Sequence, residues 1–282
     1  MAIESSFPEF FTRSDDHSKA WQRRFFRSQK VQLGAVLAAA LAANFGKPGM
    51  TCAVVLFVLA GSCNVYLLVT RADQRWWNGR AGAESAKTMA WCYCVGGAPF
   101  SKASLDADGE LSRRVNEIAT KVAQLAAVPV VSSPVTAEMR EARSSPLSER
   151  ISFYLEERIR GQMKWYSEKS TEKERLGRAW TLAAIAAQAG GIAIGVVGLL
   201  TDVDFDFVGL FSAAAATAVA WTAVQQYDVL ARSYAVASSE LSVIDTKIEG
   251  TDWTEEDWAV FVNEAEEAIS REHTSWRASR AV

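Results

Sequence analysis

Four apolar segments without a charged residue constrain this chain more than any other feature of its sequence. They comprise residues 31–45, 51–69, 180–200 and 207–221. A helix needs about 20 residues to cross the apolar core of a bilayer. The second and third segments are long enough, whereas the first and fourth must borrow flanking residues. Because the segments form two pairs with short polar loops, we expect an all-α integral membrane protein with four transmembrane helices in two hairpins.

A soluble alternative stays open at this point. The same segments could form two buried helical hairpins inside a large all-α core. Uncharged segments as long as 51–69 and 180–200 are unusual in soluble domains, so the membrane interpretation is favoured.

The charges beside the apolar segments predict the orientation of the chain. Arg and Lys are abundant before the first segment, after the second and before the third. The two hairpin loops hold Lys47 and the aspartates Asp202, Asp204 and Asp206. Because basic residues stay on the cytoplasmic side, both termini are expected in the cytoplasm. An aromatic belt at the cytoplasmic ends is expected from Trp76, Trp77, Trp180, Trp221 and Tyr227.

The charged parts of the chain carry heptad-type apolar stripes, which predict a cytoplasmic helical bundle. The stripes are Leu111, Val115, Ile118, Val122 and Leu125; Ile151, Leu155, Ile159, Met163 and Tyr166; Leu230, Tyr234, Ala237, Leu241, Ile244 and Ile248; and Trp258, Phe261, Ala265, Ile269 and Trp276. Each stripe is interpreted as core packing, with oligomerisation in a coiled coil as the alternative. Proline and serine mark a linker at 131–146 between a first unit, 1–130, and a second unit, 147–282.

A stalk helix is predicted for residues 71–94, directly after the second apolar segment. Its residues Arg80, Glu84, Lys87 and Trp91 are spaced so that they share one helix face. Arg80 can pair with Glu84, and Glu84 with Lys87, for a few tenths of a kcal/mol each.

Catalysis and cofactor binding find little support in the sequence. The glycine-rich stretches lack a strand-loop-helix context, and residues 106–110 indicate a helix-capping turn rather than a calcium loop. Cys92 and Cys94 lack a second ligand pair at zinc spacing. The net charge of -3 gives no reason to expect nucleic acid. We therefore expect no enzyme, no cofactor and no metal site.

Polar and small residues at membrane depth are the candidates for function. The amides of Gln32, Asn44, Asn64 and Gln188 could bond a neighbouring helix or line water. The pair Gly191 and Gly195 permits close helix contact. In a pore shared among protomers, Asp202, Asp204 and Asp206 would ring the outer mouth and favour cations; the alternative is a solvated loop.

The stretch "RWWNGRAGAESAKTMAWCYCVGGAPF" resembles the signature of the SLATT superfamily, the SMODS- and SLOG-associating two-transmembrane (2TM) effector domains, type 3. Its matching residues include Arg80, Glu84, Lys87, Trp91 and Tyr93. The second half resembles the type 1 domain through Arg158, Gln162, Trp165, Tyr166, Lys169, Trp180, Tyr227, Leu230, Tyr234, Glu240, Leu241, Trp258, Glu267 and Trp276. The tandem is similar to domain-of-unknown-function family 4231. Cys92 and Cys94 depart from the pattern, where a polar residue is expected.

The resemblance implies a membrane effector of a bacterial conflict system that is coupled to nucleotide second messengers. It further implies the bacterial inner membrane as the location, and a nucleotide-sensing or synthetase protein as a partner. Together with the apolar segments, it leads us to expect a homo-oligomeric channel or pore in the lipid bilayer. The alternative is a non-conducting membrane scaffold that recruits partners through its cytoplasmic helices.

Overall fold

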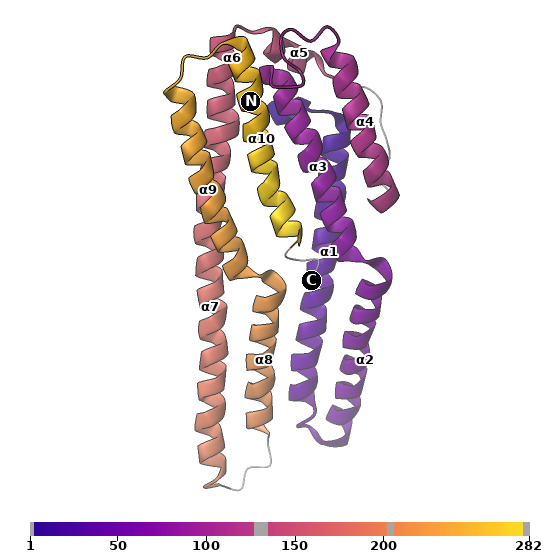
Figure 1. Cartoon of the computed structure of the whole chain (residues 1–282). Coiled ribbons are helices and arrows are strands. Elements are labelled where there is room, and N and C mark those ends of the chain that lie inside the picture. The colour runs from indigo at the N-terminus through magenta and orange to yellow at the C-terminus, as the bar shows by residue number, and fades with distance from the viewer. Residues whose placement is uncertain (1–2, 127–134, 202–205, 279–282) are drawn as a thin grey trace. The chain divides into compact units, whose positions relative to one another are not determined.

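The computed structural model describes residues 3–126, 135–201 and 206–278, and every regular element within them is helical. Figure 1 shows the helices in chain order. They are η1 (Ile3–Ser6), α1 (Glu9–Ala42), α2 (Gly46–Thr70), α3 (Ala72–Val95), α4 (Ala107–Ala126), α5 (Ala137–Ser144), α6 (Leu147–Phe153), the π-helical η2 (Tyr154–Arg160), α7 (Gly161–Gly198), α8 (Phe207–Gln225), α9 (Tyr227–Glu249) and α10 (Glu255–Ala278). The all-helical class predicted from the sequence is confirmed for these residues.

Three helical stretches among the described residues are long and apolar enough to cross a membrane. They are Gly46–Thr70, Leu147–Gly198 and Phe207–Glu249. The helix that carries the first apolar segment, α1, is not among them. Its apolar part begins after Lys30 and the helix ends at Ala42, so it falls short of a bilayer-spanning length.

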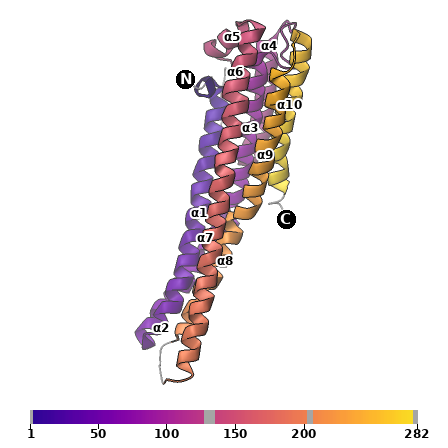
Figure 2. The ribbon, with the colours of Figure 1, turned by 90° about the vertical axis from the view of Figure 1, so that its left-hand side faces the viewer.

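The chain divides into two compact units. Unit 1 consists of the segments 1–22, 73–168 and 233–282, and unit 2 of 23–72 and 169–232. In unit 2, the second half of α1 lies beside α2, and the second half of α7 lies beside α8, as Figures 1 and 2 show. The hydroxyl of Ser28 on α1 donates to the carbonyl of Cys63 on α2 over 3.4 Å. Unit 2 thus holds all the apolar segments.

An aromatic cluster with nearby lysines lies in unit 2. The rings of Trp180 and Trp221 have centroids 6.3 Å apart, and Phe26 lies 6.2 Å from Trp221. Lys30 Nζ lies 5.6 Å from the Trp221 ring, and an equivalent contact of 5.8 Å joins Lys173 to Tyr227. Aromatic rings with basic neighbours are typical of the boundary between lipid and water.

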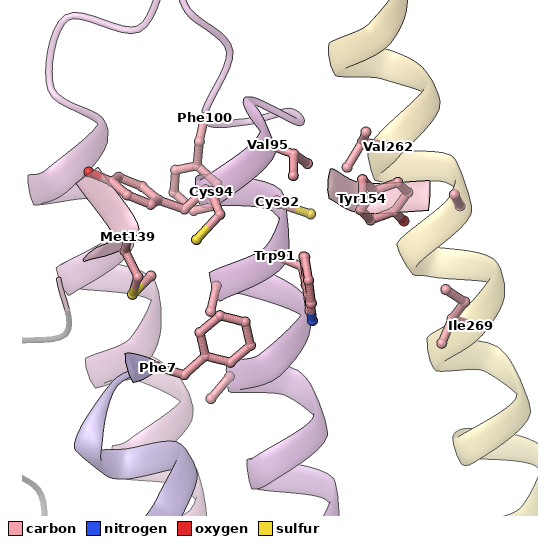
Figure 3. Packing of buried hydrophobic residues seen from close by; sticks show 14 of the residues in the cluster. Phe7, Trp91, Cys92, Cys94, Val95, Phe100, Met139, Tyr154, Val262 and Ile269 are labelled. Carbon is pink, nitrogen blue, oxygen red and sulfur yellow. The ribbon is translucent and has the colours of Figure 1, made fainter. Parts of the chain in front are cut away.

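Unit 1 has a continuous apolar core, which is built from the predicted heptad stripes. Leu111, Val115, Leu241 and Trp258 are all buried within it. Figure 3 shows Trp91 and Cys92 on α3, Val262 and Ile269 on α10, and Tyr154 between the two helices. The stripes are therefore core packing within one chain, as the sequence predicts for their described members.

Two helix starts use side-chain caps, and the cap at residues 106–110 was predicted from the sequence. At the start of α10, Thr254 Oγ1 accepts from the backbone N–H of Asp257 over 3.2 Å. At the start of α4, Asp106 Oδ1 accepts from the N–H of Gly109 over 2.9 Å, so residues 106–110 form a capping turn. Such caps satisfy N–H groups that have no partner inside the helix.

Part of the segment predicted as a linker, 131–146, is a helix. The helix α5 begins after Thr136, whose Oγ1 accepts from the N–H of Met139 over 3.3 Å and donates to the carbonyl of Ser6 over 2.9 Å. Met139 is fully buried in the core of unit 1. The predicted linker therefore contains a short packed helix, which a cap and a buried side chain help to anchor.

The two halves of the chain share an unusual joint. Arg71 joins α2 to α3 and Gln226 joins α8 to α9, and both have left-handed backbones with φ of 46° and 51°. At each joint the backbone N–H still donates to a carbonyl four residues earlier, over 2.9 Å. A left-handed conformation costs a non-glycine residue roughly 1–2 kcal/mol. The two hairpins are therefore followed by joints of the same backbone geometry.

We expect Gln226→Gly to stabilise the protein by about 1 kcal/mol, because glycine adopts φ > 0 without steric cost. The side chain contributes little to offset this gain, since its buried Oε1 has no hydrogen-bond partner among the described residues. The matched control is Gln225→Gly, which removes the same side chain from the last helical residue of α8 and should destabilise by up to about 1 kcal/mol. Thermal unfolding in detergent, followed by circular dichroism, measures both. Equal melting temperatures for the two variants would contradict the prediction.

Candidate functional site

The stalk motif of α3 lies in unit 1, and the helix packs closely against α1 at Gly79. A Cβ atom on Gly79 would lie 3.3 Å from the backbone oxygen of Ser14 and 3.3 Å from Ser18. Both serines are buried. A residue without a side chain at this position therefore lets the backbones of the two helices approach each other.

The charged residues of this face form ion pairs, some of which join separate elements. Arg80 lies 2.8 Å from Glu84, as the spacing predicts, and 3.9 Å from Asp15 on α1. Lys87 lies 2.6 Å from Glu4 of η1, a partner that spacing within α3 could not predict. The pairs line a pocket of about 500 Å³ within unit 1, which Trp91 and Trp165 also line.

Trp91 is the central aromatic residue of unit 1, with 1% of its surface exposed. Its ring lies 5.6 Å from Phe7 and 6.1 Å from Tyr154, both edge to face, and 5.3 Å from Phe153. Edge-to-face pairs add to the stabilisation from burial. The predicted motif residue therefore joins the N-terminus, α3 and the segment 153–154.

A buried ion pair lies next to Trp91. Arg158 and Glu266 are 0% and 1% exposed, and two parallel hydrogen bonds of 2.8 and 2.7 Å join them. The hydroxyls of Tyr154 and Thr88 each donate to the same carboxylate over 3.0 Å. Arg158 Cζ lies 6.0 Å from the Trp91 ring. Glu266 on α10 thus bonds side chains from two other segments of unit 1, α3 and η2.

The residue Glu266 was not singled out in the sequence, where Glu267 carried the family resemblance. Glu267 is exposed and accepts a hydrogen bond from Asn263 only four residues away. A signal for Glu266 exists: it follows Trp258 and Val262 at intervals of four, so it lies on the buried face of α10. A carboxylate inside an apolar stripe needs a buried cation, which Arg158 supplies.

The end of α3 is held by side chains from later in the chain. The carbonyl of Val95 accepts from the Arg150 guanidinium over 2.7 Å and from the Trp258 indole over 2.9 Å. Arg143 donates to the carbonyl of Tyr93 over 3.2 Å and to that of Ser101 over 2.8 Å. These contacts satisfy carbonyls that a helix end leaves without partners.

Tyr93 and the flanking cysteines are buried and protonated. The Tyr93 hydroxyl donates to Asp108 Oδ1 over 2.5 Å. Burial is the larger cause, and this hydrogen bond the next, that raises the pKa of Tyr93 above its ordinary value. Burial also raises the pKa of the Cys92 and Cys94 thiols. Within the described part of the chain, no group of three His, Cys, Asp or Glu residues could hold a metal ion. The cysteines therefore replace the expected polar residues as small core residues.

In unit 2, Asn44 and Asp206 connect the ends of the helices. The Asn44 amide donates to the carbonyl of Ala40 over 3.0 Å, and its oxygen accepts from the N–H of Asp206 over 2.6 Å. The Asp206 carboxylate accepts from the N–H of Gly209 over 2.7 Å and so caps α8. Asp202 and Asp204, the other pore-mouth candidates, lie outside the described residues.

The glycines of the helix-packing motif contact the neighbouring helix of the same chain. A Cβ on Gly191 would lie 3.2 Å from Phe211, and one on Gly195 would lie 3.4 Å from Val208. Gly190, which sequence reasoning did not single out, is tighter still, since its Cβ would lie 2.7 Å from Phe211. The ring of Phe211 thus fits against a flat surface on α7, and the motif packs α7 against α8.

The remaining amides differ from Asn44 in their surroundings. Asn64 on α2 and Gln188 on α7 are exposed, and neither has a hydrogen bond to any described residue. Gln188 lines a hollow of about 560 Å³ in unit 2 with Thr181, Thr222 and Gln226. The Oε1 atom of Gln32 is buried without a hydrogen-bond partner in the described part of the chain. Asn64, Gln188 and the Oε1 atom of Gln32 thus have no hydrogen-bond partner within the residues that the structure describes.

We expect Glu266→Ala to lower the free energy of unfolding by about 3–5 kcal/mol, because it leaves the Arg158 charge buried and unpaired. The double variant Arg158→Met with Glu266→Leu should lose less, since it removes both charges. Denaturant unfolding of the full chain in detergent, followed by near-ultraviolet circular dichroism, measures the differences. The matched control Glu267→Ala should change stability by less than about 0.5 kcal/mol. An equal loss for Glu266→Ala and Glu267→Ala would contradict the structural role of Glu266.

Comparison with known proteins identifies two adjacent domains in the chain. Residues 8–151 match the family model described as SMODS and SLOG-associating 2TM effector domain 3. Residues 154–276 match the model described as SMODS and SLOG-associating 2TM effector domain 1. No curated protein and no solved structure matches the chain. The residues described above come from both matched regions, since Thr88 and Trp91 lie in the first and Arg158 and Glu266 in the second. SLATT domains are effector domains associated with defence systems, and this chain belongs to the SLATT family as a type 3 domain followed by a type 1 domain.

Proposed function

We propose that the protein is a homo-oligomeric membrane channel or pore that acts as an effector in a bacterial nucleotide-signalled defence system. One observation carries the proposal: Asn64 and Gln188 are exposed on two of the three candidate membrane spans and have no hydrogen bond to the described residues. The family supplies the biological context, because its domains are effectors associated with defence systems.

Exposed amides at membrane depth carry a cost in free energy. A polar group that faces lipid without a partner is costly, so amides at membrane depth bond a neighbouring helix or contact water. Among the described residues, neither Asn64 nor Gln188 has a hydrogen-bond partner. Assembly of several copies can remove the cost of an unpaired amide in two ways. One amide can bond a neighbouring protomer, and the other can face a shared aqueous path. The hollow beside Gln188 has further polar groups, Thr181 and Thr222, that suit water.

The proposed topology has four transmembrane segments in two hairpins. The second half of α1 is the fourth segment, and it reaches the required length by extending toward Arg27 and Lys30, whose long side chains can extend to the lipid headgroups. In the proposed topology both termini lie on the cytoplasmic side of the bacterial inner membrane, since basic residues flank the segments at the ends nearer the termini. Unit 1 is then the cytoplasmic part, and Asp206 belongs to the outer loop with Asp202 and Asp204.

The proposed pore is gated through unit 1. A signal must bind the open and closed states with affinities that differ by several kcal/mol to shift the population. The family models are described as SMODS- and SLOG-associating, which supports a nucleotide-sensing or synthetase protein as the source of the signal.

Planar-bilayer recording of the purified full chain should give discrete current steps in an asymmetric KCl gradient. The reversal potential should favour cations, and replacing Asp202, Asp204 and Asp206 together by Asn should move it toward zero, because the ring of charge at the outer mouth is removed. A bilayer that stays silent with both wild type and Glu84→Ala, in which the Arg80 pair is lost, would favour the non-conducting scaffold instead.

Replacing Asn64 or Gln188 by Leu tests the carrying observation directly. If the amides are covered in an oligomer, each variant should weaken assembly by about 0.5–2 kcal/mol per protomer contact. If they face lipid, Leu should leave the oligomer intact. Native mass spectrometry from detergent measures the oligomer. The matched control is Ser62→Ala on α2, because the exposed Ser62 hydroxyl already bonds the carbonyl of Val58 in its own helix over 2.8 Å. Oligomer masses and single-channel conductance that are both unchanged in the Asn64 and Gln188 variants would remove the support for the pore.

A further inference from the structure

The pocket of about 500 Å³ in unit 1 has the size of a small-molecule site. We call it the charged pocket. Its walls come from η1, α1, α3, η2 and the start of α7. It brings the type 3 motif residues Arg80, Glu84, Lys87 and Trp91 together with residues of the type 1 domain, among them Trp165 and Glu157.

The charges in the pocket leave one carboxylate without a counter-charge. Seven charged side chains line it, four of them acidic and three basic. Each basic side chain has an acidic partner among them: Lys19 with Asp15 at 2.5 Å, Arg80 with Glu84 at 2.8 Å, and Lys87 with Glu4 at 2.6 Å. The seventh, Glu157, is exposed and has no ion pair with any described residue. The pocket therefore offers a negative charge, and its positive charges are already compensated.

Two tryptophans line the same pocket as Glu157. Trp165 is 39% exposed, and its ring is held by Tyr166 and Tyr234, whose centroids lie 5.1 and 5.5 Å away. Its free surface can receive a cation, because the face of an indole ring is electron-rich. Trp91 lines the same pocket and is 1% exposed, yet its indole N–H has no acceptor among the described residues. A buried donor without an acceptor is costly, and a ligand oxygen would satisfy it.

We propose that the charged pocket binds a small organic cation, an alkylammonium that carries an oxygen acceptor. The ammonium group lies against the Trp165 ring and the Glu157 carboxylate, and the oxygen accepts from the Trp91 indole N–H. An anionic ligand is disfavoured, because it would compete with Asp15, Glu84 and Glu4 for cations that are already paired. The proposal concerns binding alone and does not depend on conductance.

Isothermal titration of the full chain in a nonionic detergent tests the proposal with three probes. Choline and ethanolamine both carry an ammonium two carbons from a hydroxyl. The third probe, 3,3-dimethyl-1-butanol, has the shape of choline without its charge. We expect choline or ethanolamine to bind with a Kd below about 10 mM, and the neutral probe to bind at least about tenfold more weakly. Absence of binding by both amines, or equal binding of the neutral probe, would overturn the proposal, as would tighter binding of adenosine monophosphate.

Two variants locate the site. Trp165→Leu should weaken amine binding by about 3- to 30-fold, and Trp165→Phe by less, because a phenyl ring retains part of the cation–π attraction. Glu157→Gln should weaken it by about three- to fivefold. The matched control is Glu149→Gln, which neutralises another exposed glutamate outside the pocket. Both exchanged glutamates are exposed, so the fold is kept. Equal affinities of Glu157→Gln and Glu149→Gln, with Trp165→Leu unchanged, would place the amine elsewhere and overturn the assignment.

The same ammonium chemistry occurs in free metabolites and in lipid headgroups. Titration in nanodiscs of phosphatidylglycerol, with and without phosphatidylethanolamine, distinguishes the two sources. Weaker amine binding in the presence of phosphatidylethanolamine supports a headgroup as the occupant. Unchanged binding supports a soluble amine.

Discussion

The folding of unit 1 depends on the buried ion pair between Glu266 and Arg158. The Glu266 carboxylate accepts hydrogen bonds from Arg158, Tyr154 and Thr88, and Thr88 lies far from the other two in the chain. Because a charged group inside an apolar core is stable only with its partners in place, the pair fixes the register between α3, η2 and α10. The wider turns of the π-helical η2 occur where Tyr154 and Arg158 are both directed into this core, and such insertions are frequent at functional sites. Trp91, a residue of the type 3 motif, packs directly beside the pair.

Much of the helical architecture could be predicted because it follows from local rules. The apolar stripes locate the core helices, and the capping turn at residues 106–110 was visible as a short-range pattern. The first apolar segment was already recognised as short, and the structure adds that α1 ends at Ala42 and shortens its apolar part further. The helix α5 was missed because its stability comes from the burial of Met139, a tertiary contact that proline and serine content conceals.

Within the candidate sites, the same division holds between local and distant contacts. The Arg80–Glu84 pair follows from helix spacing, whereas Asp15 and Glu4 reach the motif from the N-terminal segment and leave no pattern in the sequence. The glycines of α7 were recognisable as a packing motif, but the sequence could not specify that the partner is Phe211 of the same chain. Likewise, Asn44 and Gln188 look equivalent as polar residues in apolar segments. Only the structure separates the bonded amide from the exposed one.

The capture of the Val95 carbonyl by Arg150 and Trp258 has a consequence for biosynthesis. The end of α3 leaves the ribosome well before either partner is made, and α10, which also supplies Glu266, is translated after all the apolar segments. The core of unit 1 therefore closes only after synthesis of α10, when contacts of high sequence separation become available. Until then the nascent chain lacks Glu266 as the acceptor of Thr88 and Trp258 as a donor to Val95. Late closure of the core thus makes a folded unit 1 depend on the synthesis of α10.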